Sequence, residues 1–254
     1  MIRRELTNGW ILFTQDDHAN LAGDIMNFWG NNQFLSIKPF EEVIFAIRNH
    51  DIGWLDWDNR PKINKENNYP ANFMEMNSEE QKRIWSKSFE KDLDEHCYSS
   101  ALIALHFSKL NEKSILDNPG DTQSQEMQKK INKLIESVFD IYYNSLKDNE
   151  LNPETMTNLK FVQIGDIISL ALCHGWLSTE LKDVPLDYEN NTVDIKLISE
   201  DGFNYKIDPN PFSLKKLSAS INGKRLLKKK FDNDDELRSS LSKSQLEKFY
   251  FNIE

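Results

Sequence analysis

The segment FVQIGDIISLALCHGW, residues 161–176, constrains the fold more than any other part of the chain. Apolar residues occupy nearly every side of a helix built from it, and a helix without a polar face must be surrounded by other elements. The segment therefore predicts a central, buried helix whose end is marked by Gly175. A chain of 254 residues is long enough to form a core around this helix.

Asp166 is the charged residue that this central helix must accommodate. It shares a stripe with Val162, Leu170 and Cys173. A buried carboxylate is strongly destabilising unless it is paired with a cation or binds a metal ion. Asp166 is therefore interpreted as one half of a buried pair with an arginine, as part of a capped helix start, or as a metal ligand.

Two further segments place polar residues where a core is expected. QDDHANLAGDIMNFWG predicts a helix with an acidic N-terminus, and His18 falls on its apolar stripe, where a core histidine is the simpler interpretation. Residues 39–53 predict a second helix that closes at Gly53 and carries His50 and Asp51 near its end. Neighbouring helical residues diverge by about 100°, yet a cation lying against the helix is within reach of both a histidine ring and a short carboxylate.

A bound metal ion would explain why these polar residues all lie where a core is expected. Imidazole and carboxylate ligands suit Mn, Fe, Zn, Ni or Co better than Ca or a thiolate-bound structural zinc. The ligand set that follows is His18, His50, Asp51 and Asp166.

The remaining histidines are interpreted one by one. His106, in SALIALHFSKL, sits on an apolar stripe and is a candidate ligand of a second metal, a proton donor, a phosphate contact or a core histidine. His96 lies ten residues earlier, about 15 Å along a helix, so both cannot ligate one ion from one straight helix. His174 is interpreted as structural, a protonated imidazole near a helix C-terminus.

The rest of the chain predicts a mainly α fold with two parts. Residues 58–78 read as a long loop that could cover a site, and helices are expected at 78–91, 93–110 and 123–147. After residue 185 the residue pattern predicts short strands separated by turn signals such as Asn222-Gly223. A helix is expected at 234–242 and a last strand near 247–252. We therefore expect a helical metal-binding domain over 1–184 and a small β-rich region over 185–254.

Charge and cysteine content restrict the partners and the compartment. The net charge of −10 argues against nucleic acid and against an anionic membrane surface, because both require a basic footprint. A small phosphorylated substrate held by a metal ion remains compatible with this charge. The run RLLKKKF is interpreted as an exposed strand face. Cys97 and Cys173 are widely separated and form no CxxC pattern, so a reducing, cytoplasmic location is expected.

The order and phrasing of these motifs carry a family resemblance. His18, the adjacent His50-Asp51 and the distant Asp166 resemble the HD-domain superfamily of metal-dependent phosphohydrolases. The phrases MIRR, QDDHANLAGDIMNFWG, AIRNHDIGWLDWDNRPKI, NNYPANF, ALHFS, FVQIGDIISLALC and PNPF look like an uncharacterised branch of that group, domain of unknown function 3891.

The resemblance implies a fold, a cofactor and a reaction. It implies an HD-like helical bundle in which His18, His50, Asp51 and Asp166 hold a divalent metal ion. The expected reaction is hydrolysis of a phosphate ester, such as a nucleotide or other small phosphorylated metabolite, by a metal-activated water. Many two-metal members use two further histidines, whereas only His106 is well placed here, which favours a single ion and weakens an iron-dependent oxygenase as an alternative. A binding protein that kept the HD scaffold without turnover is the other alternative.

Roles for the neighbouring residues follow from their place on the same helices. Asp51 and His106 are the candidate catalytic residues, His106 as the acid for the leaving group. Three residues stand one turn from the ligands and are candidates for substrate contacts or for supporting the ligands: Gln15, Arg48 and Gln163.

Overall fold

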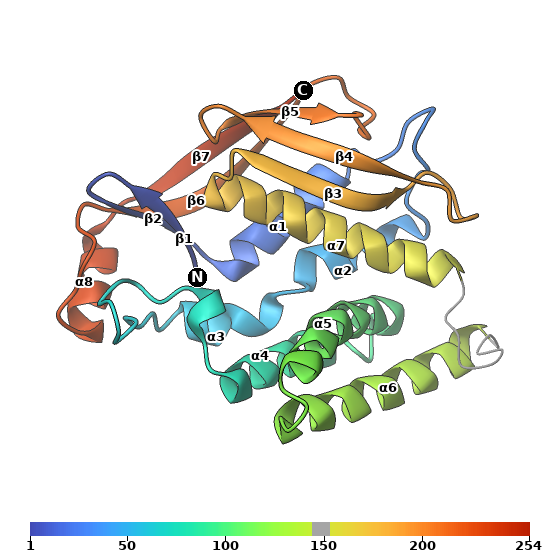
Figure 1. The fold of residues 1–254 in the computed structure, drawn as a ribbon, viewed down its shortest axis with the longest axis horizontal. Coiled ribbons are helices and arrows are strands. Elements are labelled where there is room, and N and C mark those ends of the chain that lie inside the picture. The colour runs from blue at the N-terminus through green and yellow to red at the C-terminus, as the bar shows by residue number, and fades with distance from the viewer. Residues whose placement is uncertain (144–152) are drawn as a thin grey trace.

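A curled sheet of seven strands covers two layers of helices in this computed structural model, which describes residues 1–143 and 153–254 (Figure 1). α1, α2 and α7 lie beneath the sheet, and α4, α5 and α6 form the layer farthest from it. The helices are α1 (Gln15–Met26), α2 (Phe40–Asn49), α3 (Leu55–Asp58), α4 (Ser78–Glu90), α5 (Cys97–Asp117), α6 (Thr122–Tyr143), α7 (Pro153–His174) and α8 (Asp234–Lys243), with short 3-10 turns η1 (Ile52–Trp54) and η2 (Phe73–Glu75).

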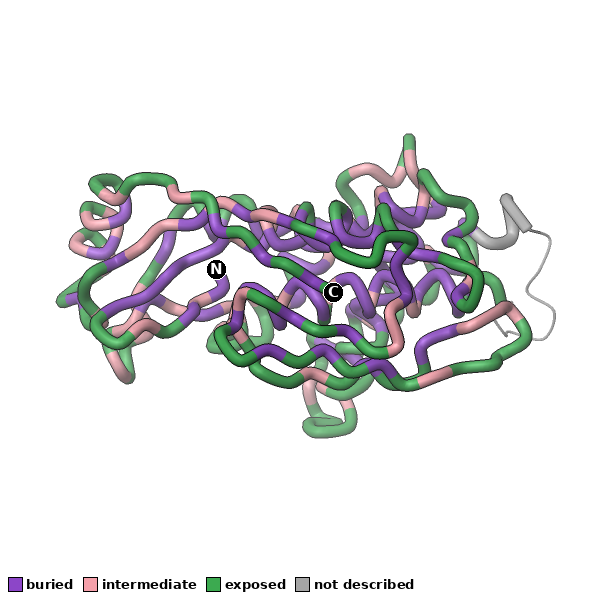
Figure 2. The backbone as a smooth tube through the Cα atoms, turned by 90° about the horizontal axis from the view of Figure 1, so that it is seen from above, coloured by how far each residue is buried: buried purple, intermediate pink, exposed green. Residues whose placement is uncertain are grey.

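The sheet runs in the order β1-β2-β6-β7-β5-β4-β3, and only β5 and β7 pair in parallel. Its strands are β1 (Ile2–Leu6), β2 (Gly9–Phe13), β3 (Ser178–Pro185), β4 (Thr192–Ser199), β5 (Asn204–Asp208), β6 (Leu217–Leu226) and β7 (Leu246–Ile253). Buried and exposed residues alternate along β4, β5 and β7, which places one face of the sheet on the helices and the other in solvent (Figure 2).

The expectation of a mainly α fold is wrong. The chain is 48% helical and 22% strand, an α/β fold with a half-barrel sheet rather than an all-α bundle. The expectation overlooked β1 and β2, which form a hairpin with Ile2 opposite Phe13. Every residue of β2 is buried, so its sequence GWILF lacks the alternation that marks a half-buried strand.

A second correction concerns Asn222-Gly223, which we expected to be a turn. The two residues lie inside β6, a continuous ten-residue strand. A Cβ atom built on Gly223 would lie 2.7 Å from the Phe13 ring and 3.1 Å from the Phe249 ring. The glycine is therefore explained by close approach of two aromatic side chains rather than by a turn.

The predicted boundary near residue 184 falls inside β3, and the sheet contains strands from both sides of it. The central helix is confirmed as α7, which packs against α1, α2, α5, β1 and β3. It is long and apolar enough to span a membrane by composition, and 67% of its apolar window is buried inside the protein. Of the helix expected at 123–147, residues 144–147 lie outside the described residues.

Other expected elements differ mainly at their ends. The helix expected at 93–110 begins instead at Cys97, after a turn in which the His96 amide donates to the Asp92 carbonyl. Helices near 78–91 and 234–242 are confirmed as α4 and α8. The long loop at 58–78 is confirmed, apart from the short turn η2 inside it.

Candidate metal centre

His18 is brought into the core by α1. Thr14 caps this helix by accepting a hydrogen bond from the Asp17 amide, and Asp16 and Asp17 favour its N-terminus. The His18 side chain has no solvent exposure. Its Nε2 lies 2.9 Å from Asp51 Oδ2, and its Nδ1 lies 2.9 Å from Ser169 Oγ on α7.

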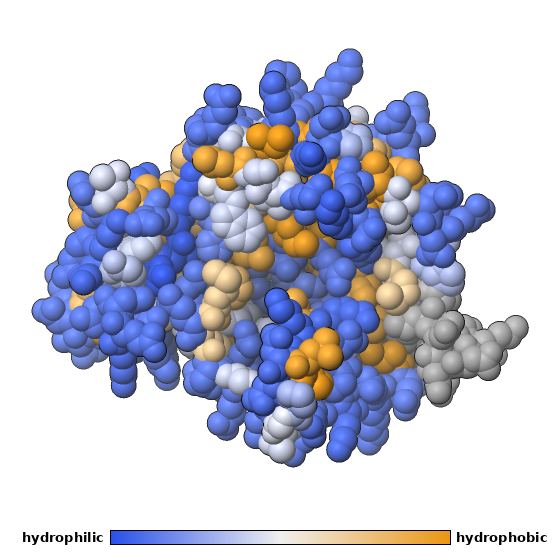
Figure 3. Space-filling model, in the orientation of Figure 1, coloured by the Kyte–Doolittle hydropathy of each residue, from blue (hydrophilic) through white to orange (hydrophobic). Residues whose placement is uncertain are grey.

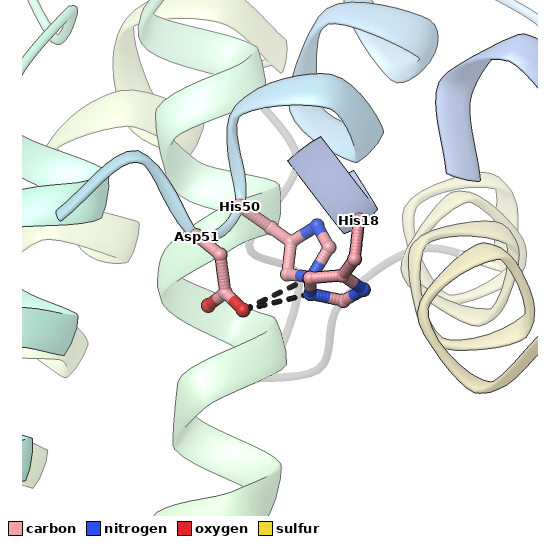
Figure 4. Close-up of side chains that lie close together, drawn as sticks. All are labelled: His18, His50 and Asp51. Atoms are coloured by element: carbon pink, nitrogen blue, oxygen red, sulfur yellow. Dashed lines mark hydrogen bonds and ion pairs between the residues drawn. The ribbon is translucent and has the colours of Figure 1, made fainter. Parts of the chain in front are cut away.

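His50 and Asp51 stand where α2 ends rather than within a helix. α2 stops at Asn49, not at Gly53 as expected, and Asp51 adopts φ −108° and ψ 16°. Because the backbone leaves the helical path here, both consecutive side chains can turn to the same side. His50 Nε2 lies 3.7 Å from Asp51 Oδ2, and Figure 4 shows the carboxylate facing both the His50 and the His18 rings.

α7 and α5 complete the cluster from two further directions. Asp166 Oδ1 lies 3.5 Å from His50 Nε2 and 4.0 Å from His18 Nε2. Its other oxygen, Oδ2, lies 3.6 Å from His106 Nε2 on α5. The four predicted ligands therefore meet in space, and His106 joins them.

The hydrogen bonds fix which nitrogen of two histidines is available. His50 Nδ1 donates to the Ile47 carbonyl at 2.8 Å, since a carbonyl can only accept. The Ser169 hydroxyl donates to the Asp166 carbonyl at 2.9 Å, so it accepts from His18 Nδ1. Both rings therefore turn the Nε2 lone pair toward carboxylates, an arrangement that is attractive only with a proton or a cation between them.

Burial and neighbouring charges shift the pKa values of His50, Asp166 and His106. Burial alone would lower the pKa of His50, but the negative charges of Asp51 and Asp166 outweigh it and raise the pKa to about 9. Burial alone would raise the pKa of Asp166, but His50, with smaller contributions from His106 and His18, holds it below its ordinary value. For His106, burial outweighs the negative charges of Asp166 and Asp51 and lowers the pKa to about 4. The pKa values of His50, His106 and Asp166 therefore depend on one another.

The residues present fit a divalent metal ion. Two groups of three have ligand atoms within 4.8 Å of one another: His18, His50 and Asp51 form one, and His50, His106 and Asp166 the other. His50 Nε2 and His106 Nδ1 are buried atoms without a hydrogen-bond partner among the described residues. Nitrogen and carboxylate donors suit the borderline metals expected from the sequence.

The three predicted neighbours differ in where they lie. Gln15 is buried, and its amide nitrogen donates to Asp51 Oδ2 at 3.1 Å, so it supports a ligand directly. Arg48 is not brought to the cluster, because its guanidinium donates to Asp24 at 2.7 Å and to the Asn20 carbonyl on the exposed side of α1. Gln163 is half-buried on α7, and its side chain forms no hydrogen bond with another described residue.

The histidines outside the cluster have structural surroundings. His96 stacks on Phe45 with ring centroids 3.7 Å apart. His174 ends α7 and stacks on Trp176. Burial lowers the pKa of His174 to about 4, so the expected protonated imidazole at the helix end is wrong, and the ring is neutral at neutral pH. Trp54 and Trp57 are buried under the 58–78 loop.

Two supporting residues were missed by sequence reasoning. Ser169 orients His18, and the only signal for it was a polar residue in an otherwise apolar helix, three positions after Asp166. Asp58 is buried and accepts a hydrogen bond from the Gln15 backbone amide at 2.6 Å, which anchors the start of α1. Asp58 follows a tryptophan in a region that reads as a loop, so its sequence carried no signal.

A family model matches most of the chain. Residues 1–228 match the family described as "Protein of unknown function (DUF3891)", so the chain belongs to this family. No curated protein and no solved structure matches the chain.

Proposed function

We propose that this member of the family is a metal-dependent hydrolase of small phosphate esters, with one divalent ion held by His18, His50, Asp51 and Asp166. One observation carries the proposal. The His18 and His50 Nε2 lone pairs, each fixed by a hydrogen bond at the opposite ring nitrogen, converge with two carboxylates. This is the arrangement by which proteins orient histidine ligands of a metal ion.

The reaction class rests on the resemblance to HD-domain phosphohydrolases, whereas the family match itself gives no activity. A divalent ion in this cluster would supply a Lewis acid for a phosphoryl oxygen and a water of lowered pKa. The chain's own residues bind the ion and orient its ligands. Gln15 holds one oxygen of Asp51, and Ser169 holds the His18 ring. His106, expected from the sequence to be the acid for the leaving group, has a pKa of about 4 and is neutral at neutral pH, so we assign it instead to contact with Asp166.

The shape of the molecule offers an approach to this centre. In the view shared by Figures 1 and 3, the surface is hollowed between α7 and α5, the two helices that carry Asp166 and His106. Asp166 is the most exposed member of the cluster, with 15% of its side chain accessible, whereas His18 is fully enclosed. A substrate would therefore meet the centre from the side of Asp166.

Metal content and turnover test the proposal together. Wild-type protein, reconstituted with Mn, Fe, Zn, Ni or Co and desalted, should retain one ion per chain by elemental analysis, and His50→Ala should not. His96→Ala is the matched control, since it removes a histidine that stacks on Phe45 outside the cluster. The metal-loaded protein should then hydrolyse at least one of a panel of phosphomonoesters, cyclic nucleotides and nucleoside triphosphates. Wild-type protein that retains no ion refutes the centre, and a metal-loaded protein inactive on the whole panel refutes the reaction.

His106 favours one alternative function. Its contact with Asp166 creates the second group of possible ligands, which would suit a two-ion centre and an iron-dependent oxygenase. Two bound irons per chain, together with oxygen consumption, would establish that alternative and displace the hydrolase.

A further inference from the structure

A hollow of about 780 Å³ lies between α3, the loop that follows it, α4 and α8. Five basic side chains line it: Arg60, Lys62, Arg83, Lys87 and Arg238. The acidic side chains in its lining are Asp56 and Glu80, so the lining carries a net charge of +3 from five cations and two anions. This local charge is opposite in sign to the −10 of the whole chain.

Carboxylates neutralise only part of this positive charge. Lys87 pairs with Asp56 at 2.8 Å, and Arg83 approaches Glu80 at 3.8 Å. Arg238 is paired within its own helix, 3.6 Å from Asp234 and 3.4 Å from Asp235. Neither Arg60 nor Lys62 lies within 4.0 Å of a carboxylate in the described ranges 1–143 and 153–254, although Lys87 and, more weakly, Arg60 lower the pKa of Asp56.

The segment that carries Arg60 and Lys62 is anchored to α8. Arg238 Nε donates to the Pro61 carbonyl at 3.1 Å, and the Ile63 amide donates to Asp234 Oδ1 at 2.8 Å. Both bonds tie the loop to α8 on either side of Lys62. Trp57 and Ile84, which also line the hollow, are buried. An anion bound here would therefore meet backbone that is already ordered, which lowers the entropic cost of binding.

Size and charge select the class of ligand. The volume is that of a small-molecule site. A long polyanion such as a nucleic acid would extend beyond the basic lining onto an acidic molecule and be repelled. A compact anion with several negative charges would instead contact Arg60 and Lys62 together.

We propose that this hollow is a binding site for a small molecule carrying two or more linked phosphate groups. None of the five residues of the candidate metal centre lines it, so the site is separate from that centre. It lies close to it along the chain, because Gly53, which lines the hollow, follows Asp51 by two residues. The proposal does not depend on the proposed function.

Calorimetric titration of the full chain with pyrophosphate, ATP and orthophosphate tests the site. All titrations contain EDTA, so that a metal ion cannot contribute. Pyrophosphate and ATP should bind with similar affinity, at least tenfold tighter than orthophosphate, and their affinity should fall as salt increases. The double variant Arg60→Glu with Lys62→Glu should weaken both by at least tenfold. His50→Ala should bind as the wild type does.

Lys196→Glu is the matched control, because it changes one exposed lysine on β4 far from the lining. Its affinities should stay within twofold of wild type, and unfolding midpoints should show that all variants are folded. The proposal is overturned by absence of pyrophosphate binding at millimolar concentration, by binding of ATP but not of pyrophosphate, or by an equal loss in Lys196→Glu.

Discussion

Replacing Ser169 by alanine isolates the hydroxyl that orients His18. This hydroxyl accepts from His18 Nδ1 and donates to the Asp166 carbonyl, both at 2.9 Å. His18 is fully buried, so water cannot take over the lost contact. A buried donor left without its partner costs about 1–3 kcal/mol, and we expect the free energy of unfolding of the metal-free protein to fall by about that amount.

The same substitution should weaken metal binding. Removing the residue that holds a ligand histidine typically reduces metal affinity about 10- to 100-fold, because the ring loses its orientation and its preferred tautomer. Competition with a fluorescent chelator would measure the dissociation constant, and urea unfolding would measure the stability of the same preparations.

Ser99→Ala separates the two effects. Ser99 is also a fully buried helical serine, on α5, and its hydroxyl donates to the Glu42 carbonyl at 2.8 Å. It should lose stability on a similar scale and keep the wild-type metal affinity. A Ser169→Ala protein that binds metal as tightly as Ser99→Ala would falsify the orienting role of this hydroxyl.

Three other substitutions probe separate features. His174 has a folded-state pKa of about 4, below its unfolded value of about 6.5, so its contribution to stability is present above pH 6.5 and is lost as pH falls toward 4. In His174→Phe, the free energy of unfolding in urea should therefore change less between pH 7 and pH 4.5 than in the wild type, and parallel pH curves for the two proteins would contradict this. Gly165→Val should lower the free energy of unfolding in urea by about 1–3 kcal/mol, because even a Cβ atom there would lie 3.1 Å from Ile47 and Met26. An unchanged free energy of unfolding would show that the packing of α7 against α1 and α2 relaxes. Arg48→Ala should retain wild-type metal content by elemental analysis, since its guanidinium binds Asp24, and loss of the metal would reveal a contact with the centre.

The candidate site was more predictable from the sequence than the fold around it. Asp166 and His18 stand out because helical periodicity shows which side chains face inward, and that periodicity is a local property. The same periodicity correctly placed Gln15 near the cluster, because Gln15 precedes His18 by three positions on one face of α1. It failed for Arg48, which precedes His50 by two residues and so points about 200° away around the helix.

The sheet was missed because its pairing is not local. β2 contacts β6 with Trp10 opposite Leu226, and no feature of GWILF indicates a partner more than two hundred residues away. Likewise, Asn222-Gly223 favours a turn by itself, and the aromatic rings of Phe13 and Phe249 override that preference only in the assembled sheet. Tertiary packing decided both cases.

The pairing of β2 with β6 also bears on the order in which the protein can be completed during synthesis. α1, which carries His18, follows β2 directly and packs on β6. Until residues 217–226 have emerged from the ribosome, β2 has a free edge and α1 lacks part of its cover, although every cluster residue has already been made. A chain that ends before β6 should therefore leave β2 and α1 without this cover, although the missing segment contributes no residue to the cluster.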